Sequence, residues 1–248
     1  MKKIFLALSV FLFFASNCFA GLPSSEYSSD ANTQLLLHMN GTDGSTTFTD
    51  SGNTVHTVTA VGNAQIDTAQ SKFGGASGLF DGTGDYLSIP DHADWYFGSG
   101  DFTIDFWVMF NSTASSLGFA GHDNDGGNVS WEFYWHSTDG IKFRYSTDGT
   151  VLTTITRAWS PSINTWYHLA IIRSGSVGKI FVDGLQIGAD IDFSTDSFYN
   201  STMGCYIGCI YGNGTISFNG WIEEFRISKG IARWTSNFAT DRRIIFAQ

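Results

Sequence analysis

Rings, carboxylates and a base alternate along three segments of this chain in a pattern suited to gripping a sugar. In an extended strand successive side chains point to opposite faces, so residues two apart share a face. The segments 101–110, 131–136 and 141–145 each carry apolar residues on one face and a mixture of polar and aromatic residues on the other. The residues predicted to line a ligand surface are Asp105, Trp107, Glu132, Tyr134, His136 and Arg144. The alternative is that these rings only cover the sheet or pack under a loop.

Few carboxylates are placed to cleave a glycosidic bond. Glycosidases flank that bond with two carboxyl groups about 5 Å apart for retention, or about 6.5–9.5 Å apart for inversion. Glu132 stands alone among aromatic residues, and Asp105 shares a strand face only with Asp101. Glu223 and Glu224 are adjacent, so a regular strand would point them to opposite faces. Asp105 and Glu132 could still meet across neighbouring strands, but the chain is not expected to be an enzyme.

The N-terminus and the charge indicate an exported protein. Lys2 and Lys3 precede the apolar run 4–15, and the small residues around Ala20 suit cleavage there, so 1–20 is predicted to be a signal peptide. The apolar run is about 12 residues long, short of the roughly 20 that span a bilayer. With 23 acidic and 13 basic residues, the chain has a formal net charge of −10, which disfavours nucleic acid and anionic lipid as partners. We therefore expect a secreted or surface-displayed protein without membrane insertion.

Alternation with a period of two dominates the rest of the chain and predicts an all-β fold. The 28 glycines against 3 prolines fit many short strands joined by tight turns. Three Asp-Gly pairs suit the positive φ of hairpin turns, namely Asp139-Gly140, Asp148-Gly149 and Asp183-Gly184. The only helix expected is a short one at 228–235. The predicted organisation is a linker at 21–34, one domain at 35–240 and a C-terminal tail at 241–248.

Cysteines and histidines give little sign of a disulfide or a metal centre. Along a strand Cys205 and Cys209 would lie about 13 Å apart, beyond the roughly 7 Å that a disulfide tolerates. Two buried thiols are therefore expected, and a bridge would need a turn at 206–208. The six histidines are scattered, without a His-x-x-x-His pair. His168 is expected to be a hydrogen-bonded structural residue.

Four segments, at 35–53, 78–108, 166–184 and 218–228, carry a recognisable pattern. They include the runs LLLHMNGTDG, FDGTGDYLSIP, WYHLAIIR, KIFVDG and GWIEEFRIS. In this order they resemble the laminin-G-like, concanavalin A-like lectin/glucanase jelly-roll superfamily. The resemblance implies two antiparallel sheets packed face to face, one of them concave, with the first and last strands as neighbours. Where the family usually has Asp-Glu in the last segment, this chain has Glu223-Glu224, which keeps the charge and lengthens one arm.

The resemblance also implies calcium, because rim calcium sites are frequent in that superfamily. Calcium takes six to eight oxygen ligands from carboxylates, amides and carbonyls. One candidate ligand set joins the opening loop to the last strand and consists of Asp43, Asp50, Glu223 and Glu224. The second candidate precedes a glycine turn and consists of Asp123, Asn124 and Asp125. The alternative for both is turn chemistry, since Asp and Asn cap their own backbone. No cofactor other than calcium is expected.

Three functions remain open from the sequence. The leading hypothesis is a secreted, non-catalytic binding module whose partner is a glycan or cell-surface polysaccharide, with calcium shaping the rim. The first alternative is a structural or adhesive protein that uses the jelly roll for contact with a protein partner. The second is a glycoside hydrolase with Asp105 and Glu132 as a rearranged carboxylate pair. The choice of glycan rests on family analogy, because a fold alone does not fix function.

Overall fold

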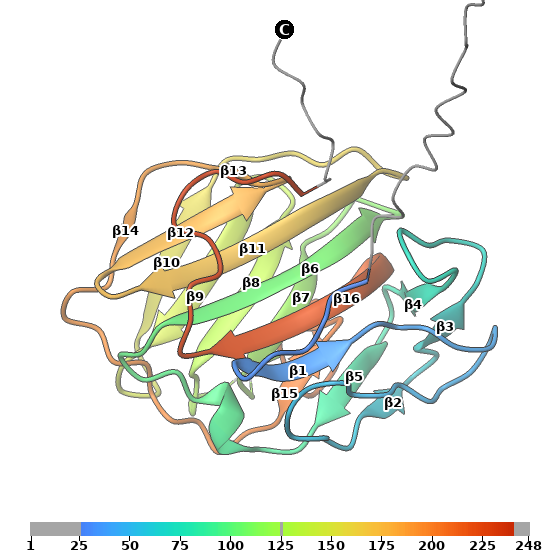
Figure 1. Ribbon diagram of the computed structural model, residues 1–248, viewed down its shortest axis with the longest axis horizontal. Coiled ribbons are helices and arrows are strands. Elements are labelled where there is room, and N and C mark those ends of the chain that lie inside the picture. The colour runs from blue at the N-terminus through green and yellow to red at the C-terminus, as the bar shows by residue number, and fades with distance from the viewer. Residues whose placement is uncertain (1–25, 125, 241–248) are drawn as a thin grey trace, which may run out of the picture.

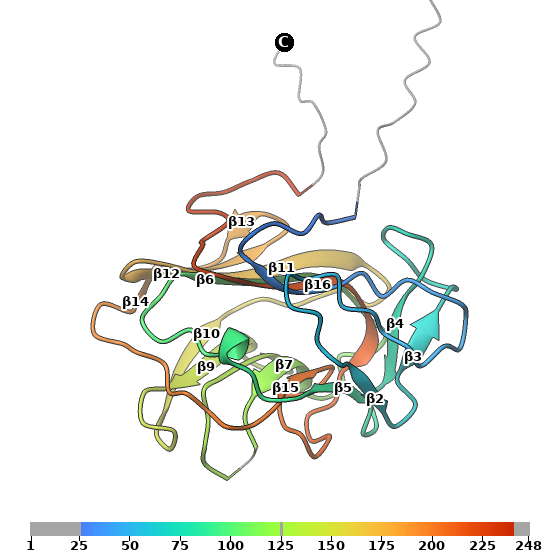
Figure 2. The ribbon, with the colours of Figure 1, turned by 60° about the horizontal axis from the view of Figure 1, so that its bottom comes forward.

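Two antiparallel sheets of nine and seven strands pack face to face, as the edge-on view in Figure 2 shows. The computed structural model describes residues 26–124 and 126–240. The predicted signal peptide, the predicted tail at 241–248 and Asp125 lie outside these residues. The prediction of an all-β, two-sheet antiparallel jelly roll is confirmed.

The nine-stranded sheet has the order β13-β12-β11-β6-β16-β4-β3, with β1 beside β16 and β14 beside β12 (Figure 1). Its strands are β1 (Thr33–Leu37), β3 (Gln65–Asp67), β4 (Ser77–Asp81), β6 (Phe102–Phe110), β11 (Trp166–Ser174), β12 (Val177–Val182), β13 (Leu185–Gln186), β14 (Ile191–Asp192) and β16 (Asn219–Lys229).

The seven-stranded sheet lies beneath it in the order β10-β9-β8-β7-β15-β5-β2. Its strands are β2 (Thr59–Val61), β5 (Tyr86–Ile89), β7 (Leu117–His122), β8 (Trp131–His136), β9 (Gly140–Ser146), β10 (Leu152–Arg157) and β15 (Cys205–Ile207). A single 3₁₀ turn, η1 (Ala93–Trp95), joins the two sheets between β5 and β6.

Apolar rings from the facing sides of the two sheets fill the space between them. Phe106 of β6 meets Phe119 of β7 and Phe133 of β8, with ring centroids 5.2 and 5.8 Å apart. All three side chains are fully buried. The alternation in the sequence therefore sends one set of residues into the core. The intervening residues of β6 and β8 point outward, away from each other on opposite sides of the sandwich.

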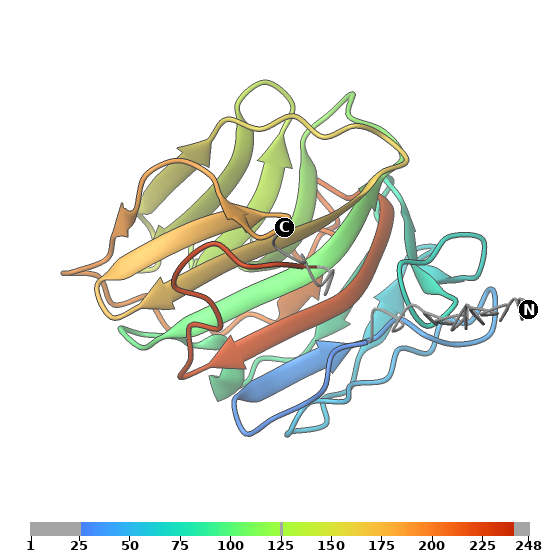
Figure 3. The ribbon, with the colours of Figure 1, turned by 45° about the horizontal axis from the view of Figure 1, so that its top comes forward.

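The first and last strands are neighbours, as the resemblance implied. In Figure 3, β1 (blue) runs beside β16 (red), and Leu37 pairs with Phe225. The predicted linker is partly structured, because β1 begins at Thr33 and the ring of Tyr27 packs 4.1 Å from the guanidinium carbon of Arg226.

A bulge in β16 changes where its two adjacent acids point. The register shifts between Glu223 and Arg226, and Glu224 takes a positive φ of 54°. Glu224 then accepts the backbone N–H of Tyr27, and Glu223 accepts that of Phe73. Both carboxylates therefore lie on the outer side of the sheet. The expectation that they would point to opposite faces is wrong, because an inserted residue breaks the alternation of a strand.

The turn predictions are confirmed, and the helix prediction is wrong. The glycines of the three Asp-Gly pairs have φ values of 92°, 84° and 76°. At 228–235 the structure has no helix: β16 runs to Lys229, and the chain beyond it lies irregularly across the nine-stranded sheet (Figure 3). Aromatic contacts hold this segment against the sheet, because Trp234 and Phe238 stack on each other and contact His168. Within the described residues, no helix has the length and apolar character needed to cross a membrane.

Cys205 and Cys209 are free and buried, which confirms the expectation of two thiols. Burial raises the pKa of the Cys209 thiol to about 12. Because the thiolate is the reactive form, both groups serve as small core residues.

Candidate functional site

The outer face of the seven-stranded sheet brings together four of the six predicted ligand residues. In the pairing of β8 with β9, Glu132 lies opposite Arg144 and Tyr134 lies opposite Lys142. The guanidinium of Arg144 forms an ion pair with Glu132 and lies 5.3 Å from the centroid of the Tyr134 ring. His136 follows on the same face, with its Nδ1 3.2 Å from Asp139 Oδ2.

Arg144 is held in place from three sides. Its Nε donates to Glu132, its plane rests over Tyr134, and its Nη2 donates to the hydroxyl of Tyr211 at 2.8 Å. The Arg144 side chain is 20 % exposed while that of Glu132 is fully buried. The cation is thus presented to solvent with its orientation already fixed. Tyr211, which the sequence did not single out, contributes a half-buried ring beside it.

Glu132 carries a strongly perturbed carboxyl. Burial, together with the neighbouring carboxyl of Asp123, raises its pKa to about 9 against the opposing effect of Arg144. Two buried carboxyls beside one another favour the state in which one of them holds a proton. Such a group can donate as well as accept a hydrogen bond near neutral pH.

A loop from β15 to β16 lies directly on β7 and borders this face. An added Cβ would be 2.4 Å from the carbonyl oxygen of Ile216 at Gly118, and 2.1 Å from that of Ile210 at Gly121. Only glycine at these positions lets the loop approach so closely. Tyr211 of this loop reaches Arg144, so the loop is one wall of the candidate site.

An open polar cleft of about 570 Å³ continues from the same loop. Three loops form it: the turn between β4 and β5, the end of the β6–β7 connection, and the segment before β16. Its lining residues are Gly82, Thr83, Gly84, Ser115, Ser116, Gly214, Ile216 and Ser217. Hydroxyls and glycine backbone dominate this lining, so the cleft offers hydrogen-bonding groups and no aromatic platform.

Asp105 and Trp107 do not belong to this face, and the prediction that all six residues form one surface is wrong. Their strand, β6, is in the nine-stranded sheet, and its outward residues face the other side of the sandwich. Trp107 is only 4 % exposed, with the Nζ of Lys72 4.3 Å above its ring. Tyr134 is also nearly covered, at 5 %. Neither ring is free to stack on a sugar.

Asp105 is a structural group. Its carboxylate accepts two hydrogen bonds from Arg226, at 3.0 and 2.8 Å, and His168 Nε2 lies 3.4 Å away. Despite full burial, which raises it, the pKa of Asp105 is lowered to about 2 by the charge of Arg226 and by hydrogen bonds from His168 and Arg226. His168 is thus the buried, hydrogen-bonded histidine that was expected. The hydrolase pair of Asp105 with Glu132 is excluded, because the two acids face opposite sides of the sandwich.

The first predicted calcium set is not assembled. Asp43 accepts from the backbone N–H of Thr68, and Asp50 is buried with backbone N–H donors of its own. Glu223 and Glu224 accept backbone N–H groups from two separate segments, at Phe73 and Tyr27 respectively. These four acids do not converge as one group of ligands among the described residues.

The second calcium set is described only in part, since Asp125 lies outside the described residues. Asp123 is 1 % exposed and accepts the backbone N–H of Asn124 at 2.5 Å. Its carboxyl adjoins Glu132, a proximity that the sequence spacing did not reveal.

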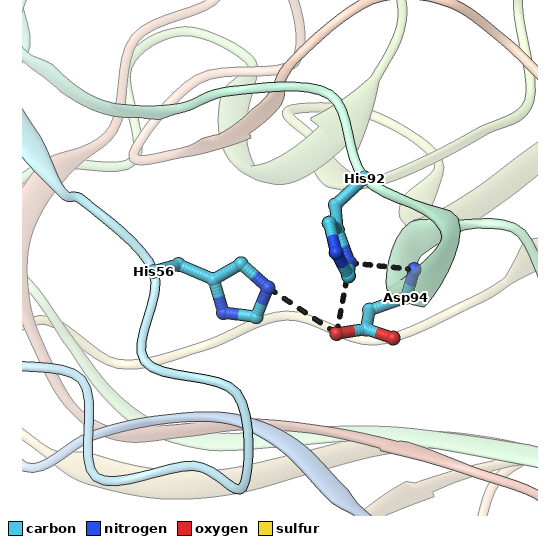
Figure 4. Close-up of side chains that lie close together, drawn as sticks. All are labelled: His56, His92 and Asp94. Carbon is cyan, nitrogen blue, oxygen red and sulfur yellow. Dashed lines mark hydrogen bonds and ion pairs between the residues drawn. The ribbon is translucent and has the colours of Figure 1, made fainter.

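One convergence of metal-ligating side chains went unpredicted. His56, His92 and Asp94 come together from two loops, as Figure 4 shows. The sequence signal was weak because His56 is far from the other two along the chain.

These features define an antiparallel jelly-roll sandwich with one polar outer face. A family model described as the concanavalin A-like lectin/glucanases superfamily matches residues 81–233, and the chain belongs to this superfamily. No curated protein matches the chain by sequence.

Solved structures share the fold at low sequence identity. The binding domain of botulinum neurotoxin serotype G is 16 % identical, with a TM-score of 0.60, over 81 % of this chain and 49 % of that one. The binding domain of Paraclostridial Mosquitocidal Protein 1 is 15 % identical, with a TM-score of 0.61, over 81 % and 50 %. Domain 4 of AbnA, a GH43 extracellular arabinanase from Geobacillus stearothermophilus in complex with arabinotriose, is 18 % identical, with a TM-score of 0.57, over 80 % and 94 %. The chain spans about half the length of the two toxin binding domains.

Proposed function

We propose that this protein is a secreted or surface-displayed, non-catalytic module that binds a glycan on the outer face of the seven-stranded sheet. The observation that carries the proposal is the fixed Arg144 guanidinium, held by Glu132, Tyr134 and Tyr211 and open to solvent on its remaining side. A donor that is already oriented loses little conformational entropy when a ligand binds. The guanidinium fork then offers N–H groups to the hydroxyls or carboxylate of a sugar.

The surroundings of Arg144 suit a polar ligand better than an apolar protein surface. The neighbouring cleft is lined mainly by glycine, serine and threonine. The large exposed hydrophobic residues come from four separate segments of the described chain, namely Val55, Val151, Ile163 and Leu185. Scattered residues of this kind are normal and do not make an apolar interface. This weighs against the alternative of a structural protein that uses this fold for protein contacts.

The comparisons support the proposal by analogy. The arabinanase domain was solved with arabinotriose, and the two toxin structures are of binding domains. The arabinanase is extracellular, which agrees with the export expected from Lys2, Lys3 and the apolar run that follows. A saccharide is therefore the first class of ligand to test.

A glycan array followed by titration calorimetry tests the proposal. We expect one or more oligosaccharides to bind at micromolar affinity, and Arg144→Lys and Tyr211→Ala each to weaken binding at least tenfold. Tyr167→Ala is the matched control, because Tyr167 is a half-buried tyrosine of the other sheet. Equal losses in Tyr211→Ala and Tyr167→Ala would place the ligand elsewhere. Silence on the array together with self-association of the protein would favour the adhesive alternative.

Calcium remains a prediction within this proposal, with Asp123 and Asn124 as the described candidate ligands. A metal that binds only the folded state raises the melting temperature by mass action. We expect millimolar calcium to raise the melting temperature of the wild type and to have less effect on Asp123→Asn. An unchanged wild-type melt would remove calcium from the proposal without touching the glycan site.

A further inference from the structure

Two histidines and an aspartate from separate loops converge on one point beside η1. His56 comes from the connection between β1 and β2, whereas His92 and Asp94 lie at the beginning of η1. His56 Nε2 is 3.2 Å and His92 Nδ1 is 3.0 Å from the same atom, Asp94 Oδ2 (Figure 4). Within residues 26–124 and 126–240, this is the only group of three or more His, Cys, Asp or Glu residues whose potential ligand atoms lie together.

Asp50 fixes the proton of His56 on the far side of its ring. The buried Asp50 carboxylate accepts backbone N–H groups from Leu36 and Gly52, at 3.0 and 2.8 Å, and from His56 itself at 3.0 Å. His56 Nδ1 lies 2.8 Å from Asp50 Oδ2. A carboxylate can only accept, so this nitrogen carries the proton. In the neutral ring the other nitrogen, Nε2, then directs a lone pair toward Asp94.

His92 Nδ1 is a second nitrogen near the same point. It accepts the backbone N–H of Asp94 in a long hydrogen bond of 3.3 Å, which a cation bound to this nitrogen would replace. The two nitrogens therefore lie 3.2 and 3.0 Å from one carboxylate oxygen, and the three potential ligand atoms are all within 4.8 Å of one another. Such an arrangement is repulsive unless a cation lies among the three atoms.

Two of the three side chains are also largely withdrawn from water. The side chains of His56 and Asp94 are only 6 % and 15 % exposed, and the ring of Trp95 lies 4.6 Å from that of His56. His56 Nε2 and Asp94 Oδ2 are buried atoms without a hydrogen-bond partner in the described part of the chain. Buried polar atoms in this state are costly, which indicates a missing binding partner.

We propose that His56, His92 and Asp94 bind a zinc ion. Zinc takes histidine nitrogen at about 2.0–2.1 Å in tetrahedral sites, which places neighbouring ligand atoms about 3.3 Å apart. The separations of 3.0 and 3.2 Å from Asp94 Oδ2 are close to that value. Two imidazole nitrogens favour zinc or a similar transition ion over calcium or magnesium, which prefer all-oxygen ligands.

Asp50 orients His56 through the ring nitrogen that does not face Asp94. Metal-binding histidines commonly donate their other ring N–H to a carboxylate, which orients the ring and strengthens the ligand. The Asp50–His56 pair has this arrangement. The His92 side chain is 44 % exposed, so solvent has access to the site from that side. Zinc would then tie the β1–β2 connection to η1 and leave one position for water or a ligand atom.

Zinc titration of chelator-stripped protein at pH 7.5 tests this site. We expect one zinc ion per chain, a melting temperature that rises with zinc concentration, and no competition from magnesium or calcium. His92→Ala and Asp94→Asn should each weaken zinc binding at least tenfold, with folding checked by circular dichroism. His136→Ala is the matched control, because His136 is also partly exposed and pairs with one aspartate, Asp139, at 3.2 Å.

A proton on His56 Nε2 is the competing cation. If protonation alone satisfied the cluster, the stripped wild type would bind no zinc at pH 7.5, and the proposal would be overturned. It would equally be overturned if His92→Ala and Asp94→Asn bound zinc as tightly as His136→Ala. Tyr211→Ala should retain full zinc binding, so failure of the glycan site and failure of the zinc site give different results.

Discussion

Asp105→Asn separates a structural role from a binding role more clearly than any other substitution in this fold. Asp105 is fully buried and accepts two hydrogen bonds from Arg226, whose side chain is 8 % exposed. Asparagine keeps the shape but replaces one accepting oxygen with an NH₂ group that faces the N–H donors of Arg226. The substitution therefore leaves a buried guanidinium without its counter-charge.

The size of the loss follows from the pKa. Lowering the Asp105 pKa from 3.8 to about 2 corresponds to roughly 2.5 kcal/mol in favour of the charged form. The uncompensated charge of Arg226 adds to this, and breaking buried pairs typically costs about 3–5 kcal/mol. We expect Asp105→Asn to lose about 3–5 kcal/mol of unfolding free energy at pH 7, and Asp105→Leu combined with Arg226→Met to recover most of it.

The pH dependence gives a second readout. Because the folded pKa of Asp105 is depressed, its contribution is present above pH 4 and is lost as the pH falls toward about 2. The difference in unfolding free energy between wild type and Asp105→Asn, measured by urea unfolding, should therefore be smaller at pH 3 than at pH 7, without vanishing, because pH 3 still lies above the folded pKa. Asp139→Asn, at an exposed acid that pairs with Lys142, should leave the midpoint near that of the wild type. A loss below about 1 kcal/mol in Asp105→Asn, or weaker glycan binding by its folded fraction, would refute a purely structural role.

Two further substitutions probe the opposite face. The folded pKa of Glu132 is raised to about 9, so the contribution of this carboxyl to folding stability is complete below about pH 4.5 and is lost as the pH rises toward 9. The stability of Glu132→Gln relative to the wild type should therefore increase in melts from pH 5 to pH 8. This relative increase in unfolding free energy is at most about 1.4 kcal/mol per pH unit. Parallel plots of stability against pH for the two proteins would contradict the prediction. Gly121→Ala would place a Cβ 2.1 Å from the Ile210 carbonyl oxygen, so we expect a loss of about 1–3 kcal/mol in urea unfolding. Gly126→Ala, with nothing near its added Cβ, is the control, and equal stabilities would show that the loop yields freely.

The alternation of apolar residues was enough to predict an all-β fold, because a strand buried on one face carries an apolar side chain at every second residue. The arrangement in two packed sheets was predicted from the family resemblance. The alternation also correctly sent Phe106 and Trp131 into the core. Alternation within one strand cannot say which sheet the strand joins. Asp105 and Glu132 therefore looked like neighbours, although β6 and β8 belong to different sheets.

Other parts of the site depended on contacts that local patterns do not encode. The bulge at Glu224 follows from pairing in the middle of a sheet, and no glycine marks it. His56 meets His92 because two loops bring both rings close to Trp95, with centroids 4.6 and 6.5 Å from it. Tyr211 reaches Arg144 because two glycines of β7, Gly118 and Gly121, let the loop that carries Tyr211 lie directly on that strand. In each case the partners are distant in sequence, and neither one alone carries a signal.

The two outer faces of the sandwich differ in how far other segments of the described chain cover them. Trp234 and Phe238 cover Phe181 and its neighbours on the nine-stranded sheet, and Tyr27 lies on Arg226 at the same face. A ligand could reach Asp105 there only by displacing both ends of the described chain. On the outer side of the seven-stranded sheet, the 209–217 loop lies against β7, and its Tyr211 contacts Arg144. This difference in covering supports the proposal that a ligand binds around Arg144, where a buried acid, two rings and a partly exposed cation are already held in place.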